Sequence, residues 1–336
     1  MKNSFILLLS CFIIGSGFAQ KRVALHSNGN TTIYSGSQPF TDAYNDAVDG
    51  DTLYLPGGQF AGPNSYNKRL VIFGTGFRTD SSQVTGKTTI PSFTLQVGAD
   101  NFHLEGVEVS GNISFSSNAK IDSVQFRRIK VNGSITIGGT NQDCEGIRIH
   151  ECVILGTASL SNTSSPEITN SIMRFIANIE NGYIANNIIT TSGNVTTRLI
   201  NNINQSLFEN NYLANLYTNN YFMQNSSGNS FVNNAINFDP TAGATNNWSN
   251  NYTGIAPADL FIDYIYLFDE AANYGLQDPI NYPGTTGNEI GLYGGYQPAK
   301  AGSIPANPHY QFKNIASQTN QNGELEVEIT IEAQNE

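Results

Sequence analysis

The sequence predicts an all-β solenoid, and three observations support that prediction. Charged side chains make up only 13% of the 336 residues, so the Lys and Glu residues that favour helices are few. The chain holds 32 Gly and 43 Asn, which are residue types of turns and left-handed backbone positions. A short apolar motif also recurs along the chain. Many short strands and turns repeated at one period are typical of a chain that coils and stacks on itself.

Residues 1–19 predict a signal peptide. A lysine lies near the start, residues 5–14 are mostly apolar, and a small-x-small cleavage site ends at Ala19. We therefore expect export, which gives a periplasmic, cell-surface or extracellular protein that begins at Gln20. Lipoprotein processing at Cys11 is an alternative, because Leu-Leu-Ser-Cys loosely resembles a lipobox. No apolar run reaches the roughly 20 residues of a membrane-spanning helix, so no transmembrane segment is predicted.

Residues 39–48 predict a short helix, since their apolar side chains recur at helical spacing from Phe40 to Val48. Residues 52–56 follow as a strand. A solenoid must cover the open end of its first coil. We expect this helix to provide the N-terminal cap.

The repeated motif is an apolar residue, then any residue, then two residues that are mostly Asn, polar or small, and then two more apolar residues. It starts at Leu104, Phe126, Ile149, Ile168, Ile184, Phe208 and Phe231. The spacings are 22, 23, 19, 16, 24 and 23 residues, which suit one solenoid coil each. A further match at 200–203 leaves the register between 168 and 208 open.

The asparagines of the motif are expected to have a structural role. A sharp turn between two strands of a coil needs a left-handed residue, which Asn tolerates. Amides at the same position of successive coils can also hydrogen-bond along the solenoid axis. We assign this role to Asn170, Asn186, Asn210 and Asn233.

The pattern changes after the repeats. Residues 259–274 are apolar and aromatic, and residues 324–331 alternate strictly, which predicts a half-exposed strand. That strand either closes the last coil or begins a small β-module. The predicted division is a signal peptide over 1–19, a β-helix with its cap over 20–296, and a connector with a terminal strand over 297–336.

Two cysteines, Cys144 and Cys152, remain in the expected mature chain. If the residues between them form a strand, extended geometry holds the two too far apart for a disulfide, whose Cα atoms lie within about 7 Å. We expect two buried free thiols.

Three segments resemble the pectate-lyase-like superfamily, in the form common among secreted Bacteroidetes proteins. Residues 47–58 with 68–76 are similar to its first coil, the Asn-Asn coils to its repeats, and residues 288–295 to its terminal segment. The resemblance implies a single-stranded right-handed parallel β-helix. It implies no single activity, because the superfamily includes lyases, hydrolases, epimerases and members without known chemistry.

The charge balance restricts the partners. With 27 acidic and 16 basic residues the formal charge is −11, which disfavours nucleic acid and anionic surfaces unless a basic patch acts locally. Polysaccharides and cell-surface glycans remain compatible with this charge. We expect a monomer.

No catalytic constellation stands out. A calcium-dependent lyase needs clustered carboxylates, and no Asp-rich cluster recurs at coil spacing. A glycosidase needs two carboxylates across one bond; Asp143 and Glu145 are the nearest pair, and a turn explains them equally well. His26, His103 and His309 show no metal spacing. The sequence therefore predicts no metal and no cofactor.

A local basic group is the best candidate for substrate binding. Its members are Arg127, Lys130, Arg148 and His150. Aligning Phe126 with Ile149 places Arg127 beside His150, one coil apart. Such a group suits an anionic sugar, with Lys130 or His150 as a conceivable base. The alternative is an exposed ion pair between Arg128 and Glu151 among solvated side chains.

Aromatic side chains offer a further candidate surface. Tyr212, Tyr217, Tyr221 and Phe222 form either a sugar-stacking strip or core packing, and Trp248 either stacks on sugar or covers the solenoid. We therefore expect a secreted, glycan- or cell-surface-associated protein. The alternatives are a lyase or hydrolase acting on uronic-acid-containing polysaccharide, and an adhesin or spacer.

Overall fold

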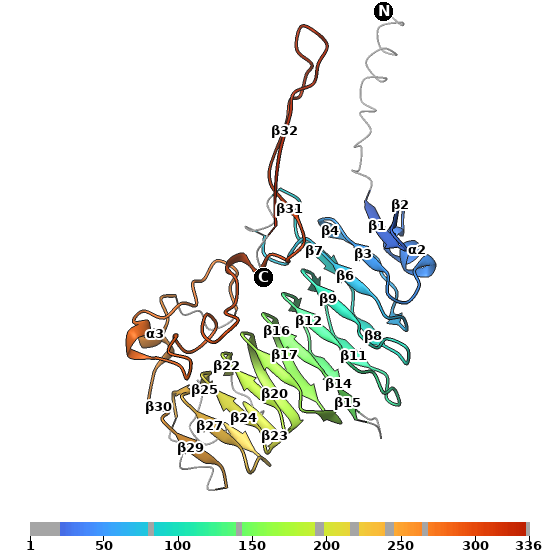
Figure 1. Cartoon of the computed structure of the whole chain (residues 1–336). Helices are drawn as coiled ribbons and strands as arrows, with labels where there is room; N and C mark the ends of the chain where they lie inside the picture. The colour runs from blue at the N-terminus through green and yellow to red at the C-terminus, as the bar shows by residue number, and fades with distance from the viewer. Residues whose placement is uncertain are drawn as a thin grey trace, which may run out of the picture.

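The computed structural model describes residues 21–79, 84–138, 143–191, 198–215, 222–238, 245–263 and 268–333. They form a parallel β-solenoid of about 8 turns, in which strands of successive coils stack into long sheets (Figure 1). The prediction of an all-β solenoid is confirmed. The predicted signal peptide and Cys11 lie outside the described residues.

The first sheet, which we call sheet A, takes one strand from each coil. Its spatial order is β2 (Asn30–Ser35), β1 (Arg22–Ser27), β3 (Thr52–Tyr54), β6 (Val71–Phe73), β9 (His103–Glu105), β12 (Gln125–Arg127), β16 (Arg148–His150), β19 (Glu167–Thr169), β21 (Tyr183–Ala185), β24 (Leu207–Glu209), β27 (Ser230–Val232) and β29 (Asn247–Ser249). Pairing is parallel from β3 onward, whereas β1 pairs antiparallel with β2 and β3.

The repeat predicted from the sequence is the core row of sheet A. Phe126 pairs with Leu104 and with Ile149, and the same register continues through Ile168, Ile184, Phe208 and Phe231. All seven side chains are fully buried. The match at 200–203 belongs to a different face of the coil, because Ile200 pairs with Ile176. The open register between 168 and 208 is thereby resolved.

The second sheet, sheet B, forms two further rows of strands along the solenoid. Its main path is β30 (Tyr252–Thr253), β28 (Ala235–Ile236), β25 (Tyr212–Asn215), β22 (Ile188–Thr191), β20 (Ile172–Glu180), β17 (Val153–Leu160), β13 (Lys130–Val131), β10 (Glu108–Val109), β7 (Thr88–Ile90) and β4 (Gly58–Gln59). A side row holds β5 (Ser65–Tyr66), β8 (Phe93–Leu95), β11 (Ile113–Phe115), β14 (Ile135–Ile137), β23 (Ile200–Asn204) and β26 (Met223–Gln224). The long strands β17 and β20 pair with both rows and so join them. Beside them, β15 (Cys144–Glu145) pairs with β18 (Thr163–Ser164).

Both ends of the core are covered. The predicted cap is helix α2 (Pro39–Asp46), which buries Phe40 and Ala43 at the N-terminal end. At the other end the indole of Trp248 stacks on Phe231, with 4.1 Å between ring centroids and 9° between planes. Trp248 therefore lies in the last strand of sheet A and covers the end of the core, rather than stacking on sugar or covering the side of the solenoid. The short helix α3 (Pro257–Leu260) follows.

The two cysteines are buried and unbridged, as predicted. Burial raises the pKa of the Cys152 thiol to about 12, because the thiolate would lose its hydration. Both thiols are core residues.

In the tight turn after the sheet A strands, two successive positions form rows along the solenoid. The first row has left-handed backbone and holds Gly106, Arg128, Glu151, Asn170, Asn186, Asn210 and Asn233. The second row is the amide ladder: Asn187 donates to Asn211, Asn211 to Asn234, and Asn234 to Asn251. The expectation that the first-row asparagines stack their amides is therefore wrong. They make the turn, and the residues that follow them make the ladder.

The C-terminal part of the chain runs back along this turn. After the short 3-10 helix η2 (Pro279–Asn281), residues 283–306, which we call the strap, lie over the first row of turn residues and include η3 (Ala301–Ser303). The first residue of the strap, Pro283, lies beside Asn233 of a late coil, and its last residue, Ala306, lies beside Glu105 of an early coil. The strap therefore crosses the coils in reverse order.

Beyond the strap the chain forms a hairpin of β31 (His309–Ile315) and β32 (Val327–Glu332). The hairpin projects away from the solenoid (Figure 1). The predicted terminal strand thus pairs with β31 rather than closing the last coil, and the sequence pattern did not indicate β31. No described helix combines the length and the apolar character needed to cross a membrane.

Candidate functional site

The structure brings three of the four predicted basic residues into one pocket. Arg127 lies on β12, and Arg148 and His150 lie on β16. They line a pocket of about 330 Å³ on the outer face of sheet A, which we call the basic pocket. Its other lining residues are Gln125, Phe126, Ile149, Glu167, Thr169 and Gln297.

The register of sheet A explains this grouping. Side chains alternate between the two faces of a strand. Because Phe126 and Ile149 point inward, the residues on either side of them point outward. Arg127 pairs with His150 in the parallel ladder, as the sequence alignment of the coils predicted. The next coil adds Glu167 and Thr169 beside them.

Hydrogen bonds and charges orient the side chains of the pocket. Arg148 Nε lies 3.0 Å from Glu167 Oε2 in an exposed pair. His150 Nδ1 lies 2.7 Å from Thr169 Oγ1, while its Nε2 lies 3.1 Å from Glu151 Oε1. Arg127 Nε lies 3.6 Å from the same Glu151 oxygen. The imidazole is thus held between a hydroxyl and a carboxylate, facing outward beside two guanidinium groups.

Behind the pocket is a buried charge network. Arg128 has no exposed side-chain surface and lies between Glu105 and Glu151, 3.0 Å from an oxygen of each. The predicted ion pair between Arg128 and Glu151 exists, but the expectation that it is exposed is wrong. The strap covers it, because the backbone N–H groups of Lys300 and Ala306 donate to Glu151 and Glu105 respectively.

This network keeps both carboxyl groups charged. Burial raises the pKa of the Glu151 carboxyl, but hydrogen bonds from His150, Arg128 and the Lys300 amide outweigh it and lower the pKa to about 2. Burial likewise raises the pKa of Glu105, and the hydrogen bonds from His103 and the Ala306 amide, with the charge of Arg128, bring it below its ordinary value.

Lys130, the fourth predicted residue, is not among the residues that line the basic pocket. It lies on β13 in sheet B, where its Nζ is 3.1 Å from Glu270 and 3.7 Å from Glu108. These contacts attach the segment after α3 to the wall of the solenoid. The geometry separates Lys130 from the other three.

Aromatic side chains continue the outer face of sheet A on both sides of the basic pocket. Toward the N-terminus the rings of Tyr54 and Phe73 stack at 5.7 Å, and Phe73 lies 5.7 Å from the His103 ring. On the other side Tyr183 donates to Glu209 over 2.9 Å, and Tyr296 is 92% exposed. Extending the repeat back to Leu53 and Ile72 would have revealed Tyr54 and Phe73 at outward positions.

The aromatic residues predicted to form either a sugar-stacking strip or core packing do not form an exposed strip in the described part of the chain. Phe222 is buried in the core inside the coils, whereas Tyr212 is buried in a second apolar cluster, where its ring lies 5.0 Å from that of Phe261. Tyr217 and Tyr221 lie outside the described residues.

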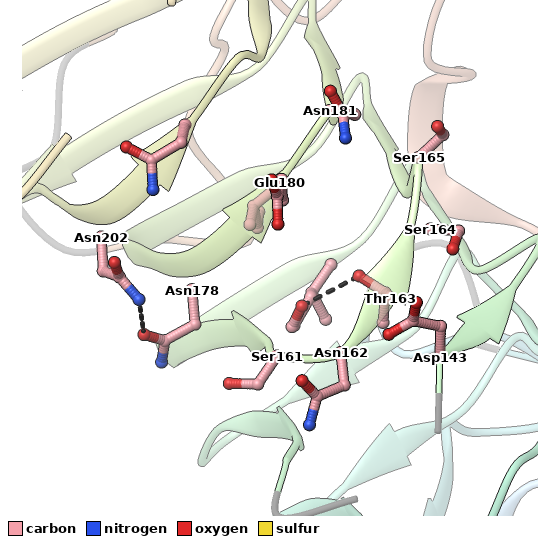
Figure 2. A pocket seen from close by; sticks show the side chains of 13 residues that line it. Asp143, Ser161, Asn162, Thr163, Ser164, Ser165, Asn178, Glu180, Asn181 and Asn202 are labelled. Carbon is pink, nitrogen blue, oxygen red and sulfur yellow. Dashed lines mark hydrogen bonds between the residues drawn. The ribbon is translucent and has the colours of Figure 1, made fainter. Parts of the chain in front are cut away.

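A second pocket, of about 450 Å³, lies beside β17, β18 and β20. Figure 2 shows that hydroxyl, amide and carboxylate side chains surround it. We call it the polar pocket; its lining residues are Asp143, Leu160, Ser161, Asn162, Thr163, Ser164, Ser165, Asn178, Ile179, Glu180, Asn181, Asn202 and Asn204. Asp143 belongs to it, whereas its predicted partner Glu145 does not.

Metal ligands are not grouped in the part of the chain that the structure describes, where no three His, Cys, Asp or Glu residues are placed to hold an ion. No family model matches the sequence, and no curated protein matches it. The fold and the basic pocket therefore describe a parallel β-solenoid with a group of basic side chains on the outer face of sheet A, flanked by aromatic side chains.

Proposed function

We propose that the protein is a secreted β-helix protein, related to the pectate-lyase-like superfamily, that binds acidic polysaccharide on the outer face of sheet A. The observation that carries the proposal is the basic pocket, in which Arg127, Arg148 and His150 converge on one outward surface of an otherwise acidic protein.

The chemistry of the pocket suits a carboxylated sugar. A guanidinium group presents paired donors that match a carboxylate. Arg148 already engages an exposed carboxylate, that of Glu167, over 3.0 Å. A uronic acid would take the place of Glu167 at little cost, because such exposed pairs contribute at most about 1 kcal/mol. The overall charge of −11 repels anions in general, acidic polysaccharides included, so binding requires this local geometry.

The flanking aromatic side chains support a polymer rather than a single sugar. Tyr54, Phe73, Tyr183 and Tyr296 lie along the same sheet face or its border, on either side of the basic pocket. Aromatic rings offer apolar faces on which sugar rings stack. A chain running along the solenoid axis would contact stacking surfaces at both ends and cations in the middle.

Affinity electrophoresis in gels containing polygalacturonate, alginate or neutral galactomannan tests the proposal. We expect an acidic polymer to retard the protein, and Arg127→Ala with Arg148→Ala to reduce the affinity about tenfold or more, as lost charge-assisted hydrogen bonds do. Arg69→Ala is the matched control, since the Arg69–Asp49 pair has nearly the same exposure as Arg148–Glu167, 52%/49% against 55%/47%. No retardation by either acidic polymer, or equal loss in the control, would reject the proposal.

A lyase is the second candidate, because His150 lies in the same pocket as both arginines. In β-elimination a base removes the C5 proton of a uronic acid, the electron pair forms the C4–C5 double bond, and the C4 glycosidic oxygen leaves with a proton. Cations beside the carboxylate stabilise the intermediate charge. Arg127 and Arg148 would supply them, and His150 would be the base.

Ultraviolet absorbance of the unsaturated product distinguishes binding from cleavage. Absorbance that rises with time in the wild type and not in His150→Ala supports the lyase. Retardation in the gel without any rise in absorbance leaves the protein as a binding protein only.

A further inference from the structure

The polar pocket differs from the basic pocket in both place and chemistry. It lies where coils leave sheet B, beside the C-terminal ends of β17 and β20. Two of its lining residues, Asp143 and Glu180, are acidic, and none of its lining residues is Lys, Arg or His. An anionic ligand would be repelled there. A ligand that fits must be neutral or cationic and rich in hydrogen-bonding groups.

Several polar groups of this pocket have no role in holding the fold. Glu180 and Asn181 are exposed, and no side-chain hydrogen bond or ion pair joins either of them to another described residue. The same holds for the carboxylate of Asp143. The amide of Asn211 in the turn ladder is the contrast, since it donates to a backbone carbonyl and to the next amide. The pocket therefore presents unused acceptors and donors to solvent.

The polar groups of the pocket come from successive coils. Four successive coils contribute to the pocket, through Asp143, Ser164, Glu180 and Asn202 respectively. Stacked parallel strands lie about 4.8 Å apart, which is close to the length of one sugar unit in an extended chain. Asn178 and Asn202 mark one step of this repeat, joined by an amide hydrogen bond of 2.9 Å (Figure 2). Neighbouring hydroxyl groups of a sugar would meet polar side chains on neighbouring coils.

From this geometry we propose that the polar pocket is a second glycan-binding site, specific for a neutral oligosaccharide that lies along the solenoid axis. Asp143 and Glu180 accept hydrogen bonds from sugar hydroxyl pairs, and Asn181 and Asn202 both donate and accept. The volume of about 450 Å³ admits two to three sugar units. The protein would then hold a neutral chain on one face and an acidic chain on another.

Isothermal titration of the full chain with neutral tetrasaccharides of β-1,4-glucan, β-1,4-mannan, β-1,4-xylan and α-1,4-glucan tests this site. We expect one of them to bind, and Glu180→Gln combined with Asn181→Gly to weaken it about tenfold. Glycine keeps the left-handed backbone that Asn181 adopts at φ 53°, so the fold is retained. The matched control is Glu328→Gln with Asn28→Gly, an exposed carboxylate and a left-handed Asn at φ 50° far from the pocket.

Each outcome decides the proposal. Binding that is weakened by the pocket variant, unchanged in the control and unchanged by Arg127→Ala with Arg148→Ala supports a second, independent site. Absence of binding by all four tetrasaccharides, or equal weakening in the control, overturns it. Titration with CaCl₂ alone provides the remaining arm: calcium binding that Glu180→Gln removes, without any sugar binding, would make the pocket a cation site and overturn the glycan proposal.

Discussion

The row of turn residues under the strap has two halves, and the two halves bind the strap through different chemical groups. In the N-terminal half the turn residues under the strap are charged: Arg128 and Glu151, with Glu105 beside them, form a buried network to which strap amides donate. In the C-terminal half the turn residues are asparagines, and neutral amides such as that of Asn210 bond the strap. The backbone is left-handed in both halves. A shared backbone shape therefore leaves the bonding chemistry free to differ, with different costs when one partner is lost.

Of the substitutions suggested by this comparison, we expect the one at Arg128 to lower the stability most. Arg128→Met leaves the carboxylates of Glu105 and Glu151 buried without their cation, which we expect to lower the free energy of unfolding by about 4 kcal/mol. Urea unfolding followed by circular dichroism measures this. Arg127→Met, next in the chain and partly exposed, should cost less than about 1 kcal/mol. Similar losses in the two variants would mean that the network contributes no more than a surface pair.

Lowering the pH should destabilise the charged half of the row and leave the asparagine half unaffected. The Glu151 carboxyl has its pKa lowered from 4.5 to about 2 in the folded protein. A lowered folded-state pKa gives stability that is present above the unfolded value and is lost as the pH falls through the folded one, here between about 4.5 and 2. Over that window we expect the free energy of unfolding to fall by up to about 3 kcal/mol from this group.

Hydrogen exchange of strap amides checks where that loss occurs. The Lys300 amide, which donates to Glu151, should lose protection in acid before the Thr285 amide, which donates to Asn210. Simultaneous loss would show that the strap opens as one piece. Arg128→Met should shift the loss at Lys300 to higher pH.

The smallest effects are expected at the asparagines. Asn211→Ala removes a buried amide that bonds two neighbouring coils, and we expect a loss of about 2 kcal/mol from the groups left unpaired. Asn210→Gly keeps the left-handed turn and removes only bonds to the strap. It should cost less than about 1 kcal/mol in global stability, while exchange of the Thr285 amide becomes faster. Equal global losses would contradict the assignment of the two rows.

Much of the fold could be predicted because its signal is periodic. From β3 to β27 each sheet A strand buries one large apolar residue at its centre, so Phe126 and Ile149 alone were enough to align two coils and to place Arg127 beside His150. The cap helix was predicted for a similar reason, since Phe40 and Ala43 follow helical spacing. Short-range periodicity reports which side of an element is buried.

The parts that were not predicted depend on contacts far apart in the sequence. Arg128 was expected at the surface because nothing near it in the sequence covers it; the covering amides come from Lys300 and Ala306. The strap itself has no apolar period: its hydrogen bonds to the turns use mainly backbone groups, and Ile290 and Leu292 are the only buried large apolar side chains among its described residues. The polar pocket was missed for a related reason, since its residues come from four coils and none forms a local motif.

The strap also changes how the solenoid unfolds. Without it, each coil would contact only its two neighbours, and stability would be close to a sum of nearest-neighbour terms. Residues 283–306 instead bond to turns from Asn233 to Glu105, so the loss of any one coil weakens the attachment of the others. A stack that could fray coil by coil becomes a cooperative unit, and a segment that follows all the coils in sequence completes that cooperativity.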